Sequence, residues 1–244
     1  SRERMQTSRK AVEDILDTGE VVYGINTGFG ALSSIRIEDS QLEELQSNLV
    51  RSHACGIGEI MDPEIVLMMM TIRANSLAKG VSGIRPSVVD TLLGMVNSRI
   101  APSIPRIGSL GASGDLAPLS HMTMGMMGEG ECLVQTGDKW VRKDSRTALE
   151  EAGLEPVKLQ AKEGLSLING TSQMCAYLTQ TVLNMETLCL AADASIACSV
   201  EAIRGSHKPF DRRVHDSRPQ VGQSISAARI SAFLSQSNIE ISHE

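Results

Sequence analysis

Aromatic side chains are scarce in this chain of 244 residues, which holds one Trp, two Tyr and three Phe. So few rings argue against a surface that stacks nucleic-acid bases. Positive charge is also in deficit, because 23 Lys and Arg face 29 Asp and Glu, for a formal net charge of −6. This balance argues against nucleic acid or an anionic membrane as a partner. The core has to be built from aliphatic residues and twelve Met.

Cysteine is sparse as well, and no two cysteines form a CxxC pair. The five cysteines are Cys55, Cys132, Cys175, Cys189 and Cys198. An odd and scattered set favours reduced, buried thiols in a cytoplasmic protein over a disulfide framework or a zinc ribbon. Long apolar runs are interrupted too, since residues 174–203 carry Asn184, Glu186, Asp193 and Glu201 at intervals. This stretch predicts a long helix buried among other helices rather than a membrane span.

Helical patterning dominates the rest of the chain. Asp62-Pro63, for example, is typical of an N-cap followed by proline at the first helical position. We expect helices over residues 1–18, 40–50, 65–77, 87–100, 116–127, 145–152, 174–203 and 224–234, with a loop over 204–222. Residues 130–143 alternate weakly around Thr136-Gly137-Asp138 and predict the only hairpin, near 131–142.

These expectations amount to a mainly α fold in which glycine-rich loops lead into long helices. No repeat or low-complexity tract divides the chain, so residues 1–244 are expected to form a single portion with no internal boundary. Three segments stand out from the helical pattern: 21–30, 108–115 and 161–170. The first holds three Gly in seven residues, which excludes a regular helix there.

Gly108–Asp115, with the sequence GSLGASGD, is the most unusual of the three. A phosphate loop requires Lys and then Ser or Thr after its last glycine, whereas Asp115 follows here and would repel phosphate. The glycines also miss the spacing of the dinucleotide fingerprint GxGxxG and of the nucleophile elbow GxSxG. Two interpretations stay open on the residues alone: a flexible turn before a helix, and a backbone that modifies itself.

The second interpretation depends on the chemistry of Ala112-Ser113-Gly114. The amide nitrogen of Gly114 can attack the carbonyl carbon of Ala112 and close a five-membered ring, because glycine lets the chain fold that tightly. Loss of one water from the ring and another through the Ser113 hydroxyl leaves 4-methylidene-imidazol-5-one (MIO). No ordinary side chain supplies such an electrophile, and nearby helix N-termini would favour its electron-poor ring.

Four sequence blocks, in order, closely resemble the signatures of the MIO-dependent aromatic amino-acid ammonia-lyases and aminomutases. They are Tyr23–Gly30 (YGINTGFG), Asn75–Arg85 (NSLAKGVSGIR), Gly111–Leu119 (GASGDLAPL) and Glu163–Thr171 (EGLSLINGT). The resemblance implies a long-helix bundle of the aspartase and fumarase-like type with glycine-rich active-site loops. It also implies an MIO group formed from Ala112-Ser113-Gly114 and no external cofactor.

The family's chains extend further than this one, so the resemblance implies an N-terminal and central portion whose C-terminal half is absent. It implies a homotetramer in which residues from three subunits combine at each active site. The expected partner is a small amino-acid substrate, in the cytoplasm.

The resemblance also carries roles for individual residues. In the family, the substrate's amino group adds to the MIO methylidene and so becomes a better leaving group. Tyr23 matches the tyrosine that then removes a proton from the β-carbon, which requires nearby positive charge because an ordinary tyrosine holds its proton at neutral pH. The alternative is a buried structural tyrosine.

Two further residues match the family's site by position. Asn169 corresponds to the asparagine that hydrogen-bonds the MIO ring, and its alternative role is that of a helix cap or turn former before Gly170. Asp115 is expected to assist ring formation or to orient the loop, and its alternative role is a simple helix N-cap.

Substrate choice depends on Ser52-His53. In this family, Phe-Leu at this position is typical of phenylalanine lyases, His-Leu of tyrosine lyases and Ser-His of histidine lyases. A neutral His53 could hydrogen-bond a substrate imidazole, since each ring offers one donor and one acceptor. The alternative is a structural histidine on a helix face.

The resemblance therefore implies deamination of L-histidine to trans-urocanate and ammonium, the first step of histidine degradation. Two alternatives stay open. One is a phenylalanine or tyrosine lyase or a 2,3-aminomutase of the same family, and the other is a non-catalytic helical scaffold subunit.

One group of residues has the spacing of a possible metal site. His207, Asp211 and His215 recur every four residues, as metal ligands on one helix face can. Pro209 interrupts such a helix and three arginines crowd the segment, so a solvated loop is favoured and no metal is expected.

Overall fold

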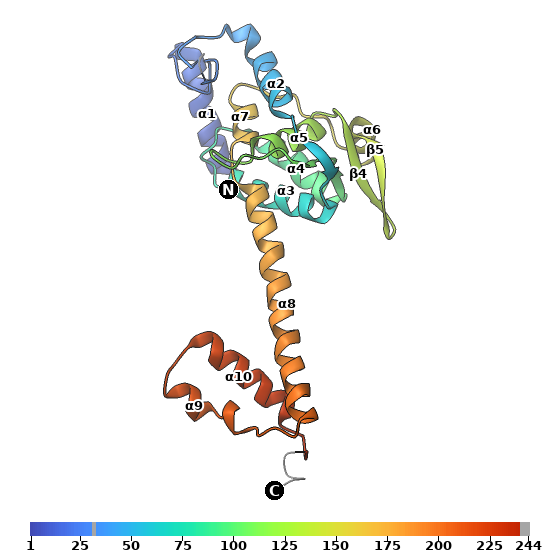
Figure 1. Cartoon of the computed structure of the whole chain (residues 1–244). Helices are drawn as coiled ribbons and strands as arrows, with labels where there is room; N and C mark the ends of the chain where they lie inside the picture. The colour runs from blue at the N-terminus through green and yellow to red at the C-terminus, as the bar shows by residue number, and fades with distance from the viewer. Residues whose placement is uncertain (31–32, 240–244) are drawn as a thin grey trace. The chain divides into compact units, whose positions relative to one another are not determined.

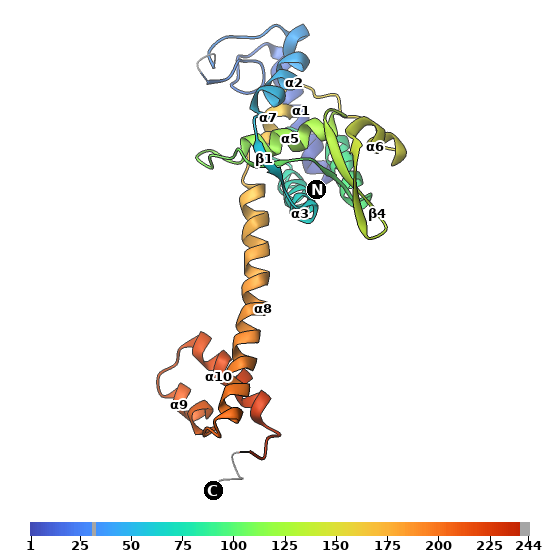
Figure 2. The same cartoon turned by 45° about the vertical axis from the view of Figure 1, so that its right-hand side comes forward.

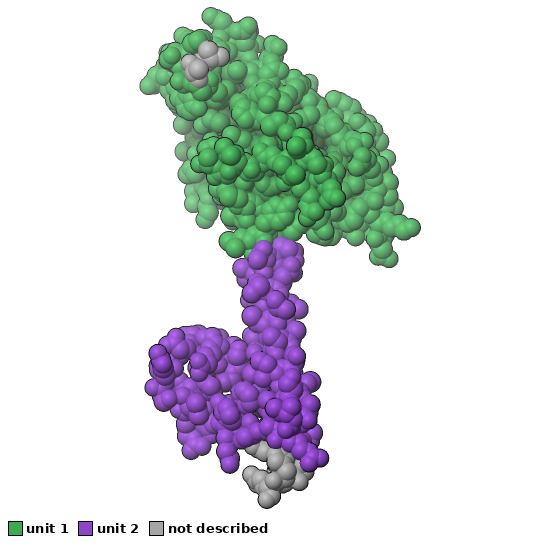
Figure 3. All heavy atoms as spheres, in the orientation of Figure 1, with its two compact units in different colours: residues 1–178 green, residues 179–244 purple. Residues whose placement is uncertain are grey.

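The computed structural model describes residues 1–30 and 33–239, which are predominantly helical (Figure 1). The chain divides into two compact units, residues 1–178 and residues 179–244 (Figure 3). The helices of the first unit are α1 (Arg2–Thr18), α2 (Leu42–His53), α3 (Pro63–Leu77), α4 (Pro86–Asn97), α5 (Leu116–Met126), α6 (Ser145–Glu151) and α7 (Glu163–Ile168). A short 3-10 turn, η2 (Asp39–Gln41), precedes α2. The helix α8 (Ser172–Ala202) contains the division between the units, so no linker composition marks it in the sequence.

Helix boundaries in the first unit follow the chemistry of the capping residues. The side chain of Asp62 accepts a hydrogen bond from the Glu64 amide at 2.8 Å, and Pro63 occupies the first position of α3, which confirms the predicted start. Gly19 ends α1 in the left-handed conformation, with φ of 70°, as glycine at this position commonly does.

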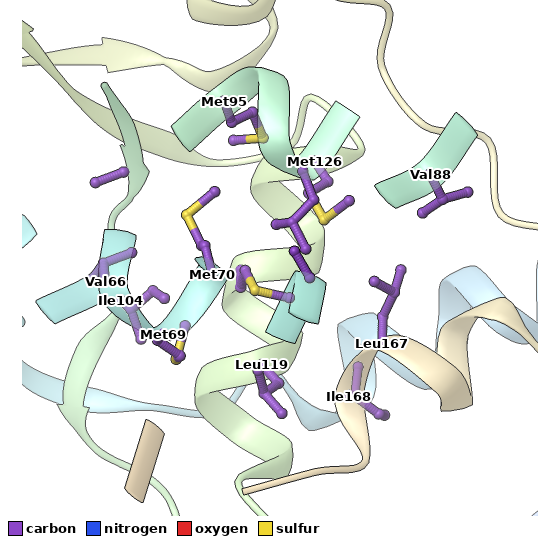
Figure 4. Close-up of a cluster of buried hydrophobic side chains, with 14 of the residues drawn as sticks. Val66, Met69, Met70, Val88, Met95, Ile104, Leu119, Met126, Leu167 and Ile168 are labelled. Atoms are coloured by element: carbon purple, nitrogen blue, oxygen red, sulfur yellow. The ribbon is translucent and has the colours of Figure 1, made fainter. Parts of the chain in front are cut away.

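Methionine fills much of the core of the first unit, as its abundance in the sequence predicts. Met70 of α3, Met95 of α4 and Met126 of α5 are fully buried and converge with Leu119 and Leu167 in Figure 4. Flexible, unbranched side chains of this kind fit irregular gaps between helices that cross at different angles. The core thus binds α3, α4, α5 and α7 into one body.

The predicted hairpin is confirmed as β4 (Glu131–Thr136) and β5 (Lys139–Asp144), and α6 lies against it (Figures 1 and 2). Other strands were not predicted: β2 (Ile100–Pro102) pairs with β4, and β1 (Ile57–Ile60) pairs with β3 (Pro105–Ile107), all antiparallel. Each has three or four residues, too few to display alternation, and β2 is buried on both faces.

The helix predicted over 87–100 is too long at its C-terminal end. It stops at Asn97, and Arg99 takes a left-handed conformation with φ of 54°. This turn sends Ile100 into β2 instead of a further helical turn. The apolar residues at the end of the predicted helix therefore belong to a strand.

The second unit consists of the rest of α8 with η3 (Lys208–Phe210), α9 (Arg212–Asp216) and α10 (Val221–Leu234). Its small core joins Ala197 of α8 to Ile230 and Leu234 of α10. The predicted loop over 204–222 therefore contains two short helical turns. His207 of this segment lies 3.1 Å from a Glu201 oxygen. Among the described residues, no cluster of His, Cys, Asp and Glu gathers three possible metal ligands.

The expectation that α8 is buried among other helices is wrong for this chain. Apolar side chains along its length are exposed, at Val182, Leu183, Met185, Leu188 and Leu190. The expectation of buried thiols is wrong as well for four of the five cysteines, because Cys132 is buried but the others are exposed. Within the second unit, only the C-terminal part of α8 contacts α10. In the part of the chain that the structure describes, no helix combines the length and apolar character that crossing a bilayer requires.

Candidate active site

The segment Gly108–Asp115 forms a bent loop that leads into α5. Ala112 and Ser113 are exposed at its tip, whereas Gly114 and Asp115 are buried. Gly114 has φ of 125°, and a Cβ atom there would lie 2.7 Å from the carbonyl oxygen of Gly170. Any other residue at this position would be strained and would also collide with the backbone. The loop therefore requires glycine at position 114.

Asp115 connects this loop to the start of α8. Its buried carboxylate accepts hydrogen bonds from the amides of Gln173 and Met174, at 2.8 and 3.0 Å, and from the Ser109 hydroxyl at 3.0 Å. It makes no side-chain capping bond to α5, the helix that it precedes. Asp115 thus caps a distant helix, where a negative charge is favoured, and so fixes the loop.

Asn169 lies directly beside the loop. It follows the last residue of α7 in an extended conformation, and the next carbonyl, of Gly170, accepts a hydrogen bond from the Asp115 amide at 2.7 Å. Asn169 and Ser113 both line one cavity of about 570 Å³. The structure therefore places Asn169 next to the segment Ala112–Asp115.

The short helix α7 positions the remaining site elements. The Oε1 atom of buried Gln46, on α2, accepts hydrogen bonds from the amides of Gly164 and Leu165, at 2.9 and 3.3 Å. A Cβ atom on Gly24 would lie 2.7 Å from a methyl group of Leu165. Both α2, which ends in His53, and the 21–30 loop, which carries Tyr23, therefore pack on α7.

Tyr23 is exposed rather than a buried structural residue. Its side chain is 55% exposed, and its ring meets that of Phe29 edge-on, with centroids 6.3 Å apart. The loop is held by Asn26, which accepts from the Val22 amide at 2.9 Å and donates to the Glu20 carbonyl at 2.7 Å. Within residues 1–30 and 33–239, no hydrogen bond or ring contact joins Tyr23 to Ala112–Asp115.

His53 presents a defined ring nitrogen. Its Nδ1 lies 2.9 Å from the carbonyl oxygen of Leu49 and 3.0 Å from the Ser52 hydroxyl. A carbonyl only accepts, so Nδ1 carries the proton and donates to it. In the neutral ring, Nε2 is then an acceptor, able to receive a hydrogen bond from an N–H of a bound molecule.

Two cationic residues near the site were not predicted from the sequence. Arg73 of α3 is buried beneath the Asn169-Gly170 turn. Lys162, before α7, takes a left-handed conformation with φ of 75°, and its Nζ would lie 3.5 Å from a Cβ on Gly24. Burial lowers the pKa of the Lys162 ammonium. Arg73 could have been identified from the sequence, because it is a charged residue within the apolar run of α3. The sequence gives no such signal for Lys162, whose position near the site depends on its left-handed backbone conformation.

His121 of α5 supports the chain just after His53. Its Nε2 accepts a hydrogen bond from the Gly56 amide at 3.1 Å, which requires the neutral ring, and burial lowers the pKa of His121 below the ordinary 6.5. Between that lowered pKa and pH 6.5 the unfolded chain binds more protons than the folded chain. The stability that this histidine contributes is therefore complete above pH 6.5 and declines as the pH falls.

We expect His121→Gln to remove this part of the pH dependence, because a glutamine oxygen accepts from Gly56 without titrating. Urea unfolding at about pH 7.5 and about pH 5.5 measures it for both proteins. The unsubstituted protein should lose more stability than His121→Gln over that interval. Equal losses would show that His121 is not a source of the pH dependence.

Comparison with known proteins places these features in context. The sequence model of the family described as aromatic amino acid lyase matches residues 1–244. A curated histidine ammonia-lyase from Geobacillus thermodenitrificans is 45% identical over 239 residues, which cover 98% of this chain and 47% of that protein. The chain therefore spans about half the length of the curated relatives that it matches.

Solved structures agree in fold. The crystal structure of histidine ammonia-lyase from Trypanosoma cruzi is similar with a TM-score of 0.87 and 38% identity, covering 98% of this chain and 46% of that one. The phenylalanine aminomutase of Pantoea agglomerans is similar with a TM-score of 0.89 and 32% identity, covering 97% of this chain and 45% of that one. Enzymes named for different reactions thus share this fold.

Proposed function

The chain belongs to the aromatic amino acid lyase family, and from this premise we propose that it is part of a cytoplasmic histidine ammonia-lyase. The proposed reaction converts L-histidine to trans-urocanate and ammonium. The observation that carries the proposal is the Ala112-Ser113-Gly114 turn, held between the Gly170 carbonyl and the start of α8. Because the chain spans about half the length of the curated relatives that it matches, the proposal concerns the full-length protein.

The residues of this turn fit an MIO group. Gly114 has the positive φ and the close backbone neighbour that only glycine tolerates, and Ser113 is exposed at the tip, where a substrate can reach it. Formed from Ala112, Ser113 and Gly114, MIO would supply an electron-poor methylidene that attracts the substrate's amino group. The Asp115 carboxylate and the Gly170 carbonyl hold the turn in place, and the Asn169 amide is available to donate a hydrogen bond beside it.

Tyr23 is the proposed base that takes the proton from the substrate's β-carbon. Its exposed side chain extends from a loop whose neighbours Asn26 and Thr27 are fully buried, so the ring is presented from a fixed backbone. Lys162 is half-buried beside Gly24, the residue that follows Tyr23. A positioned base of this kind contributes about 10²- to 10⁴-fold to the rate.

A homotetramer with sites shared between subunits is the second part of the proposal. Several large apolar side chains of α8 are exposed in the single chain, and extensive exposed apolar surface marks association sites. Packing against the α8 helices of other subunits would bury these side chains in a bundle of long helices, as the sequence predicts.

Histidine is the proposed substrate because of the acceptor that His53 presents. With Nδ1–H bonded to Leu49, the free Nε2 accepts from the imidazole N–H of L-histidine. The rings of phenylalanine and of cinnamate offer no N–H. A site built to hydrogen-bond a substrate group discriminates strongly against analogues that lack it.

Incubating the full-length protein with L-histidine, L-phenylalanine and L-tyrosine separately tests the function. We expect urocanate from L-histidine as the main product and no product from L-phenylalanine, whose ring offers Nε2 no donor, whereas the phenol O–H of L-tyrosine can donate and makes tyrosine the competing substrate. His53→Phe should lower kcat/KM for L-histidine about 100-fold, and His53→Gln, which keeps an acceptor, should lower it less. Cinnamate or a β-amino acid would identify a different enzyme of the family, and no product at all would indicate a scaffold.

A further inference from the structure

Arg73 is a buried cation whose role the proposed reaction does not explain. It lies on α3 and is 5% exposed, and no carboxylate of the described residues lies within ion-pair distance. Burial lowers the pKa of its guanidinium to about 10, so the charge persists at neutral pH. Burying an uncompensated charge is costly unless its N–H groups are well used.

The guanidinium binds the C-terminal end of α7. Its Nη2 atom donates to the carbonyl oxygens of Ser166 and Asn169, the second at 2.9 Å. Carbonyl groups at the end of a helix lack partners within the helix, and they carry partial negative charge that attracts a cation. The carbonyl groups at the C-terminal end of α7 therefore serve Arg73 as the negative partner that a carboxylate would otherwise provide.

The guanidinium also presses on Gly170. A Cβ atom at Gly170 would overlap Nη1 of Arg73 and would lie 3.0 Å from its Cζ. The other side of the same residue faces the reactive loop, since its carbonyl oxygen accepts from the Asp115 amide at 2.7 Å and lies against the Gly114 α-carbon. One residue thus separates Arg73 from the segment that is to cyclise, and Arg73 lines the cavity that contains Ser113.

We propose that Arg73 is a positioning residue for the reactive loop: it fixes the Asn169-Gly170 turn so that the Gly170 carbonyl holds Gly114 where its amide can attack Ala112. This rests on the proposed function, since it assigns Arg73 a part in forming the MIO group. Ring closure depends on close approach of two backbone atoms, and misplacement by about 1 Å costs about 100-fold in such reactions. Lysine is no equivalent, because it lacks the planar guanidinium that donates through Nη2 while its Nη1 lies against Gly170.

The test is the intact mass of the purified full-length protein and its variants. In the unsubstituted protein we expect the mass to be two waters below that of the sequence. In Arg73→Met the fraction of chains with this loss should fall about tenfold, and Arg73→Lys, which retains one donor group, should recover part of it.

Arg9→Met is the matched control. Arg9 is also buried, and it donates to a backbone carbonyl, that of Ala161, at 3.0 Å, but it makes no contact with Gly170. We expect this variant to lower the thermal midpoint while losing both waters completely. A merely structural role of Arg73 would give Arg73→Met the same behaviour.

Gly170→Ala provides a second route should Arg73→Met fail to fold. Its methyl group displaces the guanidinium without removing it, so dehydration should again be incomplete. Complete dehydration of Arg73→Met, or of Gly170→Ala, would overturn this inference alone. An unmodified mass in the unsubstituted protein would overturn the proposed function as well.

Discussion

Ser113→Ala should abolish deamination, with kcat lowered by at least about 1,000-fold, and should leave a chain of unmodified mass. The Ser113 hydroxyl is the group that leaves as the second water, and without it no methylidene can form. Because Ser113 is exposed at the tip of its loop, the free energy of unfolding should change by no more than about 0.5 kcal/mol. Initial rates, intact mass and urea unfolding measure the three effects.

Ser98→Ala is a suitable control for this prediction. Ser98 is also exposed and follows the last residue of α4, outside the 108–115 segment. It should keep both the activity and the loss of two waters. Substantial activity in Ser113→Ala would mean that the electrophile is not made from this serine.

Gly114→Ala should destroy both the activity and part of the stability. The residue has φ of 125°, and a Cβ atom would lie 2.7 Å from the Gly170 oxygen, which belongs to the backbone and cannot move aside easily. The strain and the collision together should cost at least about 2 kcal/mol in the free energy of unfolding. Urea unfolding and intact mass measure the two losses.

Gly111→Ala separates the two causes. Gly111 also has positive φ, of 77°, but the nearest atom to an added Cβ would be the Met174 sulfur at 3.8 Å. This variant should lose only the conformational part, about 1 kcal/mol. Equal losses in the two variants would show that the Gly170 carbonyl does not constrain Gly114.

Much of the helical fold could be predicted because its signals are local. The cap at Asp62, the proline after it and the stop at Gly19 act within one turn of their helices, and each appears in the structure as expected. The short strands β1, β2 and β3 could not be predicted, because partners such as Val134 for Ile100 are chosen by tertiary packing.

The unusual backbone of the 108–115 loop was predictable, whereas the contacts that support the loop were not. The glycines on either side of Ser113 predict an irregular backbone from the local sequence. The hydrogen bond from Gln173 to Asp115 is not predictable in this way, because it joins residues 58 apart in sequence. The bond from Arg73 to the Asn169 carbonyl joins residues 96 apart. A sequence shows which side chains can donate, but only the fold determines which carbonyls they reach.

The exposed apolar side chains of α8 show a related limit. The even apolar composition of this helix predicts burial, and the second unit alone does not provide it. An evenly apolar composition indicates that a helix is buried, but it does not indicate whether the same chain or another chain covers it.

The most direct test of the central claim is the intact mass of the full-length, catalytically active protein. Cyclisation of Ala112-Ser113-Gly114 predicts a mass lower than that of the translated sequence by two waters, with the deficit located by peptide mapping to the fragment that contains Ser113. A protein that converts L-histidine to urocanate while this fragment retains its full mass would contradict the account.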